Sequence, residues 1–289
     1  MAAIFGPARG GSTGNGCSDR CRLPRAPHPT ITTLVGRSGS AAAYHPSRRA
    51  RLGEERTLKP KSGRLPRVAR RVASVMLPLT SDELLTTTRT VRKRLDLERP
   101  VPLQLIRECL TIALQAPSGS NRQHWEWVVV TDAEQRAAIG GYYRRAWEAY
   151  ATSPAFAGTQ GGDDPARVQV QTRIGDSGWH LGRHMGDVPV LVLPCLRVSS
   201  GTLAAGNQAG VWGSLLPAAW SYCLAARARG LGTAWTTLHL DYEREVADIL
   251  GLPQNVAQGA LIPTAYHTGD TFQAAAREPL DTVLHLDRW

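Results

Sequence analysis

The stretch from Ala113 to Asp132, ALQAPSGSNRQHWEWVVVTD, decides how the rest of the chain is organised. An apolar helical run ends at Ala116-Pro117, and a polar loop leads into Trp125–Val130, which has the aromatic and β-branched content of a buried strand. A loop of hydrogen-bonding side chains between a helix and a strand favours a ligand site. An ordinary connection is the alternative, and a second polar stretch, Arg89-Thr90-Val91-Arg92, tips the choice toward a site.

The net charge of +10 is concentrated at the N-terminal end of the chain. Residues 1–76 contain 15 Lys or Arg against 3 Asp or Glu, whereas the remaining residues contain 19 against 21. A nearly neutral remainder argues against a folded domain that follows a phosphate backbone, so no nucleic-acid partner is expected. The alternative, nucleic-acid binding through the basic segment alone, would show as salt-dependent binding that truncation removes.

The composition divides the chain into two parts. Residues 1–76 are rich in Gly, Pro, Ser, Ala and Arg and hold too little apolar surface to offset the entropy of ordering, which predicts a disordered basic extension. Translation that begins at Met76, an inert tail and a transit-peptide-like segment are the interpretations left open. Residues 77–289 carry the periodic apolar pattern and form the predicted folded domain.

The five cysteines give no disulfide framework, which together with the absence of a secretory signal predicts a cytoplasmic protein. No run of 18 apolar residues occurs, so no membrane span is expected. Cys17 and Cys21 lack a second ligand pair for zinc, and Cys109, Cys195 and Cys223 lie in apolar segments.

Helical and strand patterns alternate along residues 80–289, with long connections between them. Asp132 is expected to cap one helix and Asp241 another, which Gly251 is expected to end. Pro217 is expected to kink a long helix or mark its start. These patterns predict the α+β class, with a central sheet between helices. The expected helices begin at Ser81 and cover 103–116, 132–150, 168–185, 209–229 and 241–250; the expected strands cover 125–130, 190–193, 231–237 and 257–266; residues 270–289 form an extended arm.

Several common catalytic motifs are absent or incomplete. No phosphate loop and no G-x-S-x-G elbow occurs. Gly230-Leu231-Gly232 follows a helix and has Trp235 at the third glycine position, which argues against a dinucleotide fold. His180 and His184 share a helix face, but Leu181 stands where a zinc hydrolase needs Glu, so no metal is expected.

Three polar clusters remain, and together they suit a nucleotide-like ligand. They are Arg89 with Arg92, the side chains of residues 118, 121 and 123, and the late Arg277. Arg89, Arg92 and the late Arg277 offer the guanidinium groups that bind phosphate. The side chains of residues 118, 121 and 123 supply donors and acceptors for the edge of a heterocycle. A phosphate attached to a planar ring satisfies both kinds of group.

Over residues 79–289, the sequence resembles the nitroreductase family of FMN-dependent oxidoreductases. Arg89-Thr90-Val91-Arg92-Lys93 resembles the family's R-S-x-R-K element, and residues 116–125 resemble its A-P-S-x-x-N-x-Q-P-W element. Residues 224–233 resemble L-A-A-x-x-x-G-L-G-T, and Arg277-Glu278-Pro279-Leu280 resembles the late basic element. His124 replaces the usual proline and Arg94 the usual aromatic residue, which bears on substrate specificity.

The resemblance implies a three-layer α/β/α fold with a mostly antiparallel sheet and a domain-swapped C-terminal arm. It implies a homodimer with FMN at the interface, and a backbone N–H near Thr236 is expected to tune flavin N5. It assigns FMN binding to Arg89, Thr90, Val91, Arg92, Pro117, Ser118, Gly119, Asn121, Gln123, Trp235, Thr236, Thr237 and Arg277.

The implied reaction passes hydride from NAD(P)H through flavin N5 to an electron-poor small molecule, such as a nitroaromatic or a quinone, in a ping-pong sequence. No side chain has to act as acid or base, because the flavin carries the chemistry. Other flavin chemistry on the same fold, such as dehydrogenation or dehalogenation, is one alternative. A flavin-binding or sequestering protein without turnover is another.

Overall fold

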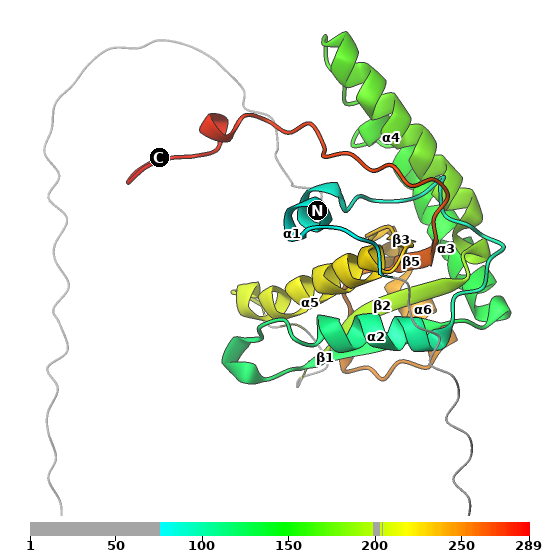
Figure 1. The fold of residues 1–289 in the computed structure, drawn as a ribbon. Helices are drawn as coiled ribbons and strands as arrows, with labels where there is room; N and C mark the ends of the chain where they lie inside the picture. The colour runs from blue at the N-terminus through cyan, green and yellow to red at the C-terminus, as the bar shows by residue number, and fades with distance from the viewer. Residues whose placement is uncertain (1–75, 199–202, 204) are drawn as a thin grey trace, which may run out of the picture. The chain divides into compact units, whose positions relative to one another are not determined.

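The computed structural model describes residues 76–198, 203 and 205–289, and the predicted extension of residues 1–76 lies almost entirely outside this range. Over the described residues, five strands form one sheet with helices on both faces (Figure 1). This confirms the predicted α+β class and the three-layer arrangement. The strands are β1 (Trp125–Val130), β2 (Val190–Arg197), β3 (Leu231–Thr233), β4 (Val256–Gln258) and β5 (Ile262–Tyr266).

The sheet is antiparallel throughout its paired strands. Its order is β1-β2-β5-β3, and β4 also pairs with β2. The register places Trp125 opposite Leu196, Val190 opposite Thr264 and Leu231 opposite Tyr266. Strand β2 therefore has β1 along one edge, and β5 and β4 in succession along the other.

Strand β2 is buried on both faces of the sheet, from Val190 to Leu196. Leu191, Leu193 and Cys195 pack in a core with residues of α3 (Ala133–Ala151), α4 (Pro165–His184) and α6 (Glu243–Leu250). Val190 and Val192 pack in a second core with α2 (Leu103–Ala113) and α5 (Ala209–Ala228). Successive side chains of β2 point to opposite faces of the sheet, as in any strand. Because the side chains on both faces are apolar, helices must cover each side. The short α1 (Ser81–Thr87) contacts α5.

The predicted helix signals at two ends hold in the structure. The Asp132 side chain accepts a hydrogen bond from the Gln135 backbone N–H at 2.9 Å and caps α3. Gly251 ends α6 with φ of 62°, a left-handed conformation that glycine adopts at low cost. Among the described helices, none is long and apolar enough to cross a membrane.

Two details of the predicted elements were wrong. Asp241 does not cap α6: it lies inside a 3₁₀ turn, Leu238–Tyr242, and Tyr242 is the N-cap. The run 257–266 is not one strand, because the backbone at Gly259 turns its N–H to the Pro194 carbonyl at 2.9 Å and separates β4 from β5. Of the two predicted roles of Pro217, the start of α5 is excluded because the helix begins at Ala209, and a kink stays a prediction.

Gly140 of α3 lies against the 3₁₀ turn Met185–Asp187, where the two backbones approach closely. A Cβ on Gly140 would lie 2.5 Å from the backbone nitrogen of Gly186 and 2.7 Å from its Cα. The Arg136 guanidinium donates to the carbonyls of Gly186 and Val188 at 3.0 and 2.8 Å, which fixes the same contact. The neighbouring Gly141 has no atom within 4 Å of its Cβ position.

We therefore expect opposite effects from alanine at these two glycines. Gly140→Ala should destabilise the protein by about 1–3 kcal/mol, because backbone atoms cannot move aside as side-chain ends can. Gly141→Ala should be neutral or stabilise by up to about 1 kcal/mol, because alanine is the better helix former. Denaturant unfolding of the two variants measures both changes, and equal effects would contradict the close approach.

Candidate functional site

The segment Arg89–Lys93 runs beside β3, at the end of the sheet. Thr90 forms a parallel bridge with Thr233, and the Val91 backbone N–H donates to the Thr233 carbonyl at 2.8 Å. The buried Val91 side chain packs on Gly232, where a Cβ would come within 3.0 Å of it. The pairing places the arginines of this segment next to the chain that leaves β3 toward Trp235–Thr237.

Arg92 is tied to residues from two helices. Its Nη1 donates to Ser177 Oγ of α4 at 3.1 Å. Burial lowers the pKa of the Arg92 guanidinium, and the nearby Tyr143 phenol of α3 opposes this. Burial raises the pKa of Tyr143, while the nearby Thr236 side chain and the charge of Arg92 act in the other direction. Tyr143 thus connects two of the predicted site segments.

A cavity of about 260 Å³ opens over this segment. The Arg89 guanidinium donates to the Gln273 carbonyl at 3.1 Å, so the start of the C-terminal arm forms part of its border. The positive charges of Arg89, Arg92, Lys93 and Arg94 around it make this cavity suitable for an anion such as a phosphate. Its lining residues are Arg89, Thr90, Val91, Arg92, Lys93, Arg94, Ser177 and Phe272.

The polar loop after α2 is held in a strained conformation. Ser120, Asn121 and Gln123 have φ of 53°, 52° and 48°, which side chains other than glycine rarely adopt. Gln123 Nε2 donates to Asn121 Oδ1 at 2.9 Å, and the Gly119 N–H donates to Ser214 Oγ of α5 at 2.9 Å. Backbone strain at exposed polar residues is typical of ligand-binding loops. Pro117 is exposed and Ser118 is half-buried at the start of this loop.

The loop and the cavity are apart within one chain. Ser214, which holds the loop, and Arg227, whose guanidinium lies 4.2 Å from the centroid of the cavity-lining Phe272, are both in α5. They are thirteen positions apart along the helix, which corresponds to about 20 Å. The predicted site residues therefore divide into two groups near opposite ends of α5.

The loop after β3 and the late arginine complete the predicted set. Trp235, Thr236 and Thr237 are half-buried and follow directly on the strand that pairs with Arg89–Lys93. The Thr236 backbone N–H donates to the Leu261 carbonyl at 3.1 Å, so this N–H is already used within the fold. Arg277 is exposed on the C-terminal arm and does not line the cavity.

Two side chains at this site were missed by sequence reasoning. Ser177 lies in the middle of α4 and Tyr143 in α3, and neither is among the predicted site residues. No local motif marks either residue, because each reaches Arg92 through tertiary packing.

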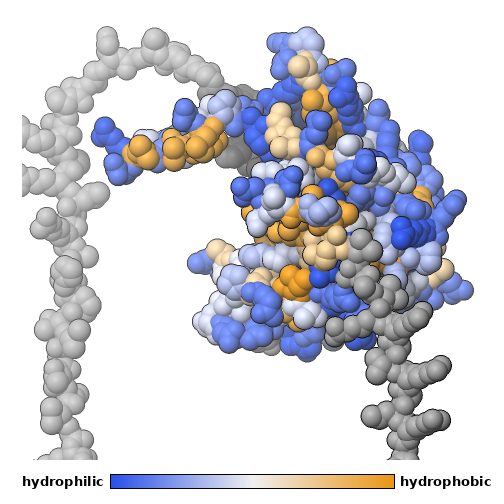
Figure 2. All heavy atoms as spheres, viewed as in Figure 1, coloured by the Kyte–Doolittle hydropathy of each residue, from blue (hydrophilic) through white to orange (hydrophobic). Residues whose placement is uncertain are grey.

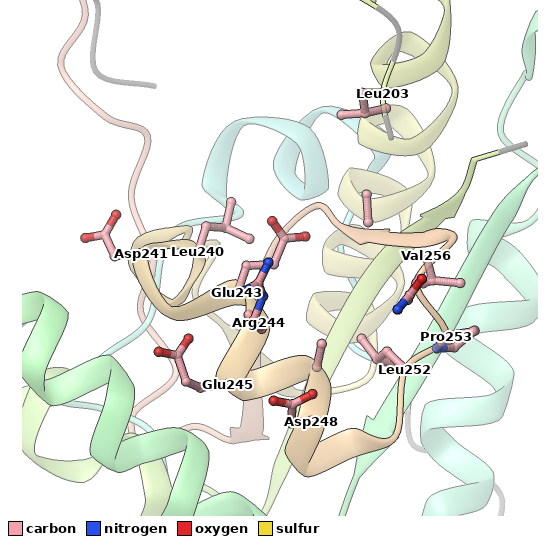
Figure 3. Close-up of a pocket in the computed structure, with 13 residues that line it drawn as sticks. Leu203, Leu240, Asp241, Glu243, Arg244, Glu245, Asp248, Leu252, Pro253 and Val256 are labelled. Carbon is pink, nitrogen blue, oxygen red and sulfur yellow. The ribbon is translucent and has the colours of Figure 1, made fainter. Parts of the chain in front are cut away.

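A larger pocket of about 1040 Å³ lies elsewhere, along α6 and the 3₁₀ turn before it (Figure 3). Its lining includes the carboxylates of Asp241, Glu243, Glu245 and Asp248, with Arg244 as the one basic residue among the described lining residues. Four carboxylates repel a phosphate, and none of the predicted site residues contributes to this pocket. The smaller cationic cavity is therefore the better candidate.

Comparisons with known proteins show the family to which the chain belongs. The sequence profile of the nitroreductase family matches residues 85–266. A 4-nitrobenzoate reductase from Nocardioides sp. (strain LMS-CY) is 26% identical over 225 residues, which cover 69% of this chain and 87% of the relative. The chain therefore belongs to the nitroreductase family and is an oxidoreductase of that family.

Two solved structures share the fold. An oxidised iodotyrosine deiodinase bound to FMN and 3-iodo-L-tyrosine has a TM-score of 0.54 and 19% identity, covering 72% of this chain and 99% of the other. A variant of the FMN and NADPH-dependent nitroreductase NfnB, from sphigopyxis sp. strain HMH, has a TM-score of 0.51 and 20% identity, covering 73% and 100%. At these identities, the likeness concerns the fold.

The burial of His239, two residues after Thr237, makes the stability of the protein depend on pH. Its ring is fully buried, and neither ring nitrogen has a hydrogen-bond partner among the described residues. Burial lowers its pKa from 6.5 to about 3. Only the unfolded chain gains a proton as the pH falls below about 6.5, so stability is lost between about pH 6.5 and pH 3.

Because of His239, we expect the free energy of unfolding to fall by about 2 kcal/mol when the pH is lowered from 7.5 to 5. His239→Leu should abolish this part of the pH dependence, whereas the same change at the exposed His285 should preserve it. Unfolding midpoints at the two pH values, measured for the three proteins, make the comparison. An unchanged pH dependence in His239→Leu would mean that the buried ring is protonated in the folded state.

Proposed function

We propose that this protein is an FMN-dependent oxidoreductase that transfers hydride from NAD(P)H to an electron-poor acceptor, such as a nitroaromatic or a quinone. The observation that carries the proposal is the cationic cavity made by Arg89–Lys93 against β3. Membership of the nitroreductase family supports it, as do a relative described as a 4-nitrobenzoate reductase and a neighbour described as FMN and NADPH-dependent.

The cavity fits the phosphate end of FMN. Arg89, Arg92 and Lys93 would neutralise the phosphate, and the Thr90 hydroxyl would add a donor. A volume of about 260 Å³ lies below the range of about 300–1,000 Å³ that is usual for pockets enclosing small molecules. The flavin ring would therefore extend beyond this cavity, along the loop Trp235–Thr237 that adjoins it.

The remaining predicted residues would orient the ring and keep water away from it. FMN, when bound, supplies reversible hydride chemistry at N5. Asn121 and Gln123 offer amide groups to the polar edge of the ring. Because the Thr236 N–H is used by Leu261, the Thr237 N–H is the better candidate for contact near N5: among the described residues, the fold gives it no acceptor. No side chain needs to transfer a proton in this scheme.

We propose a homodimer in which each site takes residues from both chains. The strained loop and the cationic cavity lie near opposite ends of α5, about 20 Å apart by helical rise, so one chain alone does not bring them together. Two copies related by a two-fold axis can place the loop of one chain over the cavity of the other. Such a dimer has two equivalent sites.

The C-terminal arm would contribute to this dimer. Apolar side chains lie exposed along it, with Leu286 77% and Trp289 99% exposed (Figure 2). An exposed apolar run of this kind is typical of a segment that packs on a partner. We propose that residues 77–289 carry the function and that the arm of each chain embraces the other. The apolar residues exposed on the arm are Leu280, Val283, Leu284, Leu286 and Trp289.

Purified full-length protein should be yellow and should bleach when NADPH or NADH is added without oxygen. The absorbance at about 450 nm, characteristic of oxidised flavin, measures the reduction. Restoration of the colour by a nitroaromatic or a quinone would complete the cycle. A protein that stays colourless with added FMN would contradict the proposal, and a yellow protein that never bleaches would indicate flavin sequestration.

Mixed dimers test whether the site is shared between chains. Arg89→Gln alters the cavity and Asn121→Asp alters the loop, so each variant alone should bind FMN weakly. A dimer of one Arg89→Gln chain and one Asn121→Asp chain has one intact site if the residues come from different chains. Random mixing should then restore about one quarter of the wild-type flavin content, since about half the dimers are mixed and each has one intact site.

The control for this experiment is a mixture of wild-type chains with chains carrying both substitutions. If each site were built within one chain, that mixture would retain intact sites, whereas the two single variants would restore none. Bound flavin after gel filtration is the readout for all mixtures.

A further inference from the structure

A cluster of positive side chains surrounds Phe272, where the C-terminal arm leaves the domain. The guanidinium carbons of Arg94 and Arg227 lie 4.3 and 4.2 Å from the centroid of the Phe272 ring. The His267 ring meets the same ring edge-on, with centroids 4.7 Å apart. We call Arg94, Arg227, His267 and Phe272 the Phe272 cluster. Arg94 directly follows the segment Arg89–Lys93, Arg227 lies in α5, and His267 and Phe272 follow β5.

Part of the cluster is well bonded and fixes the backbone of the arm. Arg94 Nε donates to the Thr268 carbonyl at 2.6 Å, and its Nη1 donates to the Thr271 carbonyl at 2.9 Å. Gly269 has φ of 73°, and a Cβ there would lie 2.6 Å from Arg94 Nη2, so a glycine is needed for the guanidinium to fit. The position of Arg94 is therefore determined by the fold.

The rest of the hydrogen-bonding capacity of the cluster is unused. Arg227 is only 5% exposed, yet its side chain makes no hydrogen bond or ion pair with any described residue. Arg227 Nε, Arg94 Nη2 and His267 Nε2 are all buried without a partner in the part of the chain that the structure describes. Three nitrogens in one cluster thus lack acceptors.

Arg229, two residues further along, differs from Arg227 in having one hydrogen bond and one ion pair, although its Nε also lacks a hydrogen-bond acceptor among the described residues. Its Nη1 donates to the Ala225 carbonyl at 3.1 Å, and its Nε lies 3.6 Å from a carboxylate oxygen of Glu108. Arg227 has neither contact. The partial negative charge at the end of α5 favours both cations, but it does not supply Arg227 with an acceptor.

No negative charge compensates the cluster among the described residues. Burial and the charge of Arg94 lower the pKa of Arg227, and burial and both arginines lower the pKa of His267. Asp270 is the acidic residue in the same turn, but it is exposed and forms no ion pair with a described residue. A buried guanidinium without a counter-charge is costly, which is why buried charges in proteins are paired.

We propose that the Phe272 cluster is a binding site for a small oxyanion, with Arg227 and Arg94 as its principal donors. An oxyanion of the phosphate or sulfate type supplies several acceptors at once and cancels the excess positive charge. This site adjoins the cavity proposed for the cofactor phosphate, and Arg227 and His267 are the members of the cluster that do not line that cavity. Arg94 and Phe272 form a wall common to both.

His267 gives the site a proton linkage. Its Nδ1 lies 2.9 Å from the Gly269 carbonyl, which can only accept, so Nδ1 carries a hydrogen and Nε2 of the neutral ring has none. Nε2 donates to an anion only after the ring is protonated. Binding of the anion therefore becomes tighter as the pH falls, with Arg94, Arg227 and Asp270 as the charged groups around the ring.

The oxyanion has two possible sources, which are free phosphate or sulfate in solution and the phosphate group of a nucleotide substrate. The inference goes beyond the proposed function, and it stands if the protein proves not to bind flavin. Sulfate is the suitable probe, because its charge does not change between about pH 5 and pH 8, so any pH dependence belongs to the protein.

The experiment is calorimetric titration of full-length protein with sodium sulfate, at constant ionic strength, after saturation with FMN. Arg227→Met removes the central donor, Arg244→Gln removes an equal charge from α6, and Arg89→Gln alters only the cofactor cavity. Flavin absorbance of each sample reports the cofactor separately. NADPH and NADH are compared as competitors of sulfate, which distinguishes a nucleotide phosphate from a free anion.

We expect Arg227→Met to weaken sulfate binding by at least about tenfold, the loss of a charge-assisted hydrogen bond, and the other two variants to change it less than about twofold. Binding should strengthen from pH 8 to pH 6, and His267→Gln should remove this trend. If Arg227→Met does not fold, Arg227→Lys, which keeps the charge without the planar fork, should weaken binding to an intermediate degree. Equal sulfate affinity in wild type and Arg227→Met, or no binding by wild type, would overturn the proposal.

Discussion

The structure depends on the burial of β2 on both of its faces. Seven consecutive residues, Val190 to Leu196, are buried, and the strand pairs with β1, β4 and β5. A strand with apolar groups on both faces is stable only if helices cover each side, which here are α2 and α5 on one face and α3, α4 and α6 on the other. The layers, the order of the sheet and the positions of its edges follow from this requirement.

Polar and strained residues lie at the margins of this core, where the fold leaves backbone groups and charges unpaired. Arg89–Lys93 attaches to β3, and a hydrogen bond from Gly119 to Ser214 ties the loop after α2 to α5. The arginines around Phe272 also lie at the edge of the core, near the point where β5 ends and the C-terminal arm begins. Such positions cost stability when left unsatisfied, so they are where ligands and partners contribute most.

The sequence predicted the elements whose signals are local. Asp132 as a cap, Gly251 as a helix end and Trp125–Val130 as a strand each depend on residues within one turn or one strand. Predictions failed where a distant backbone decided the outcome. The run 257–266 reads as one strand, but the Pro194 carbonyl takes the Gly259 N–H, and Asp241 reads as a cap although the chain before it first makes a 3₁₀ turn.

The sequence by itself therefore determined the fold class, the family and the two polar stretches proposed for the cofactor, because periodicity and short motifs are properties of neighbouring residues. Only the tertiary structure decided that Tyr143 and Ser177 reach Arg92, and that the two polar stretches lie near opposite ends of α5. It also decided that Arg94, Arg227 and His267 meet at one ring. These contacts join residues far apart in the chain, and their geometry depends on how the helices pack on the sheet, which no local pattern encodes.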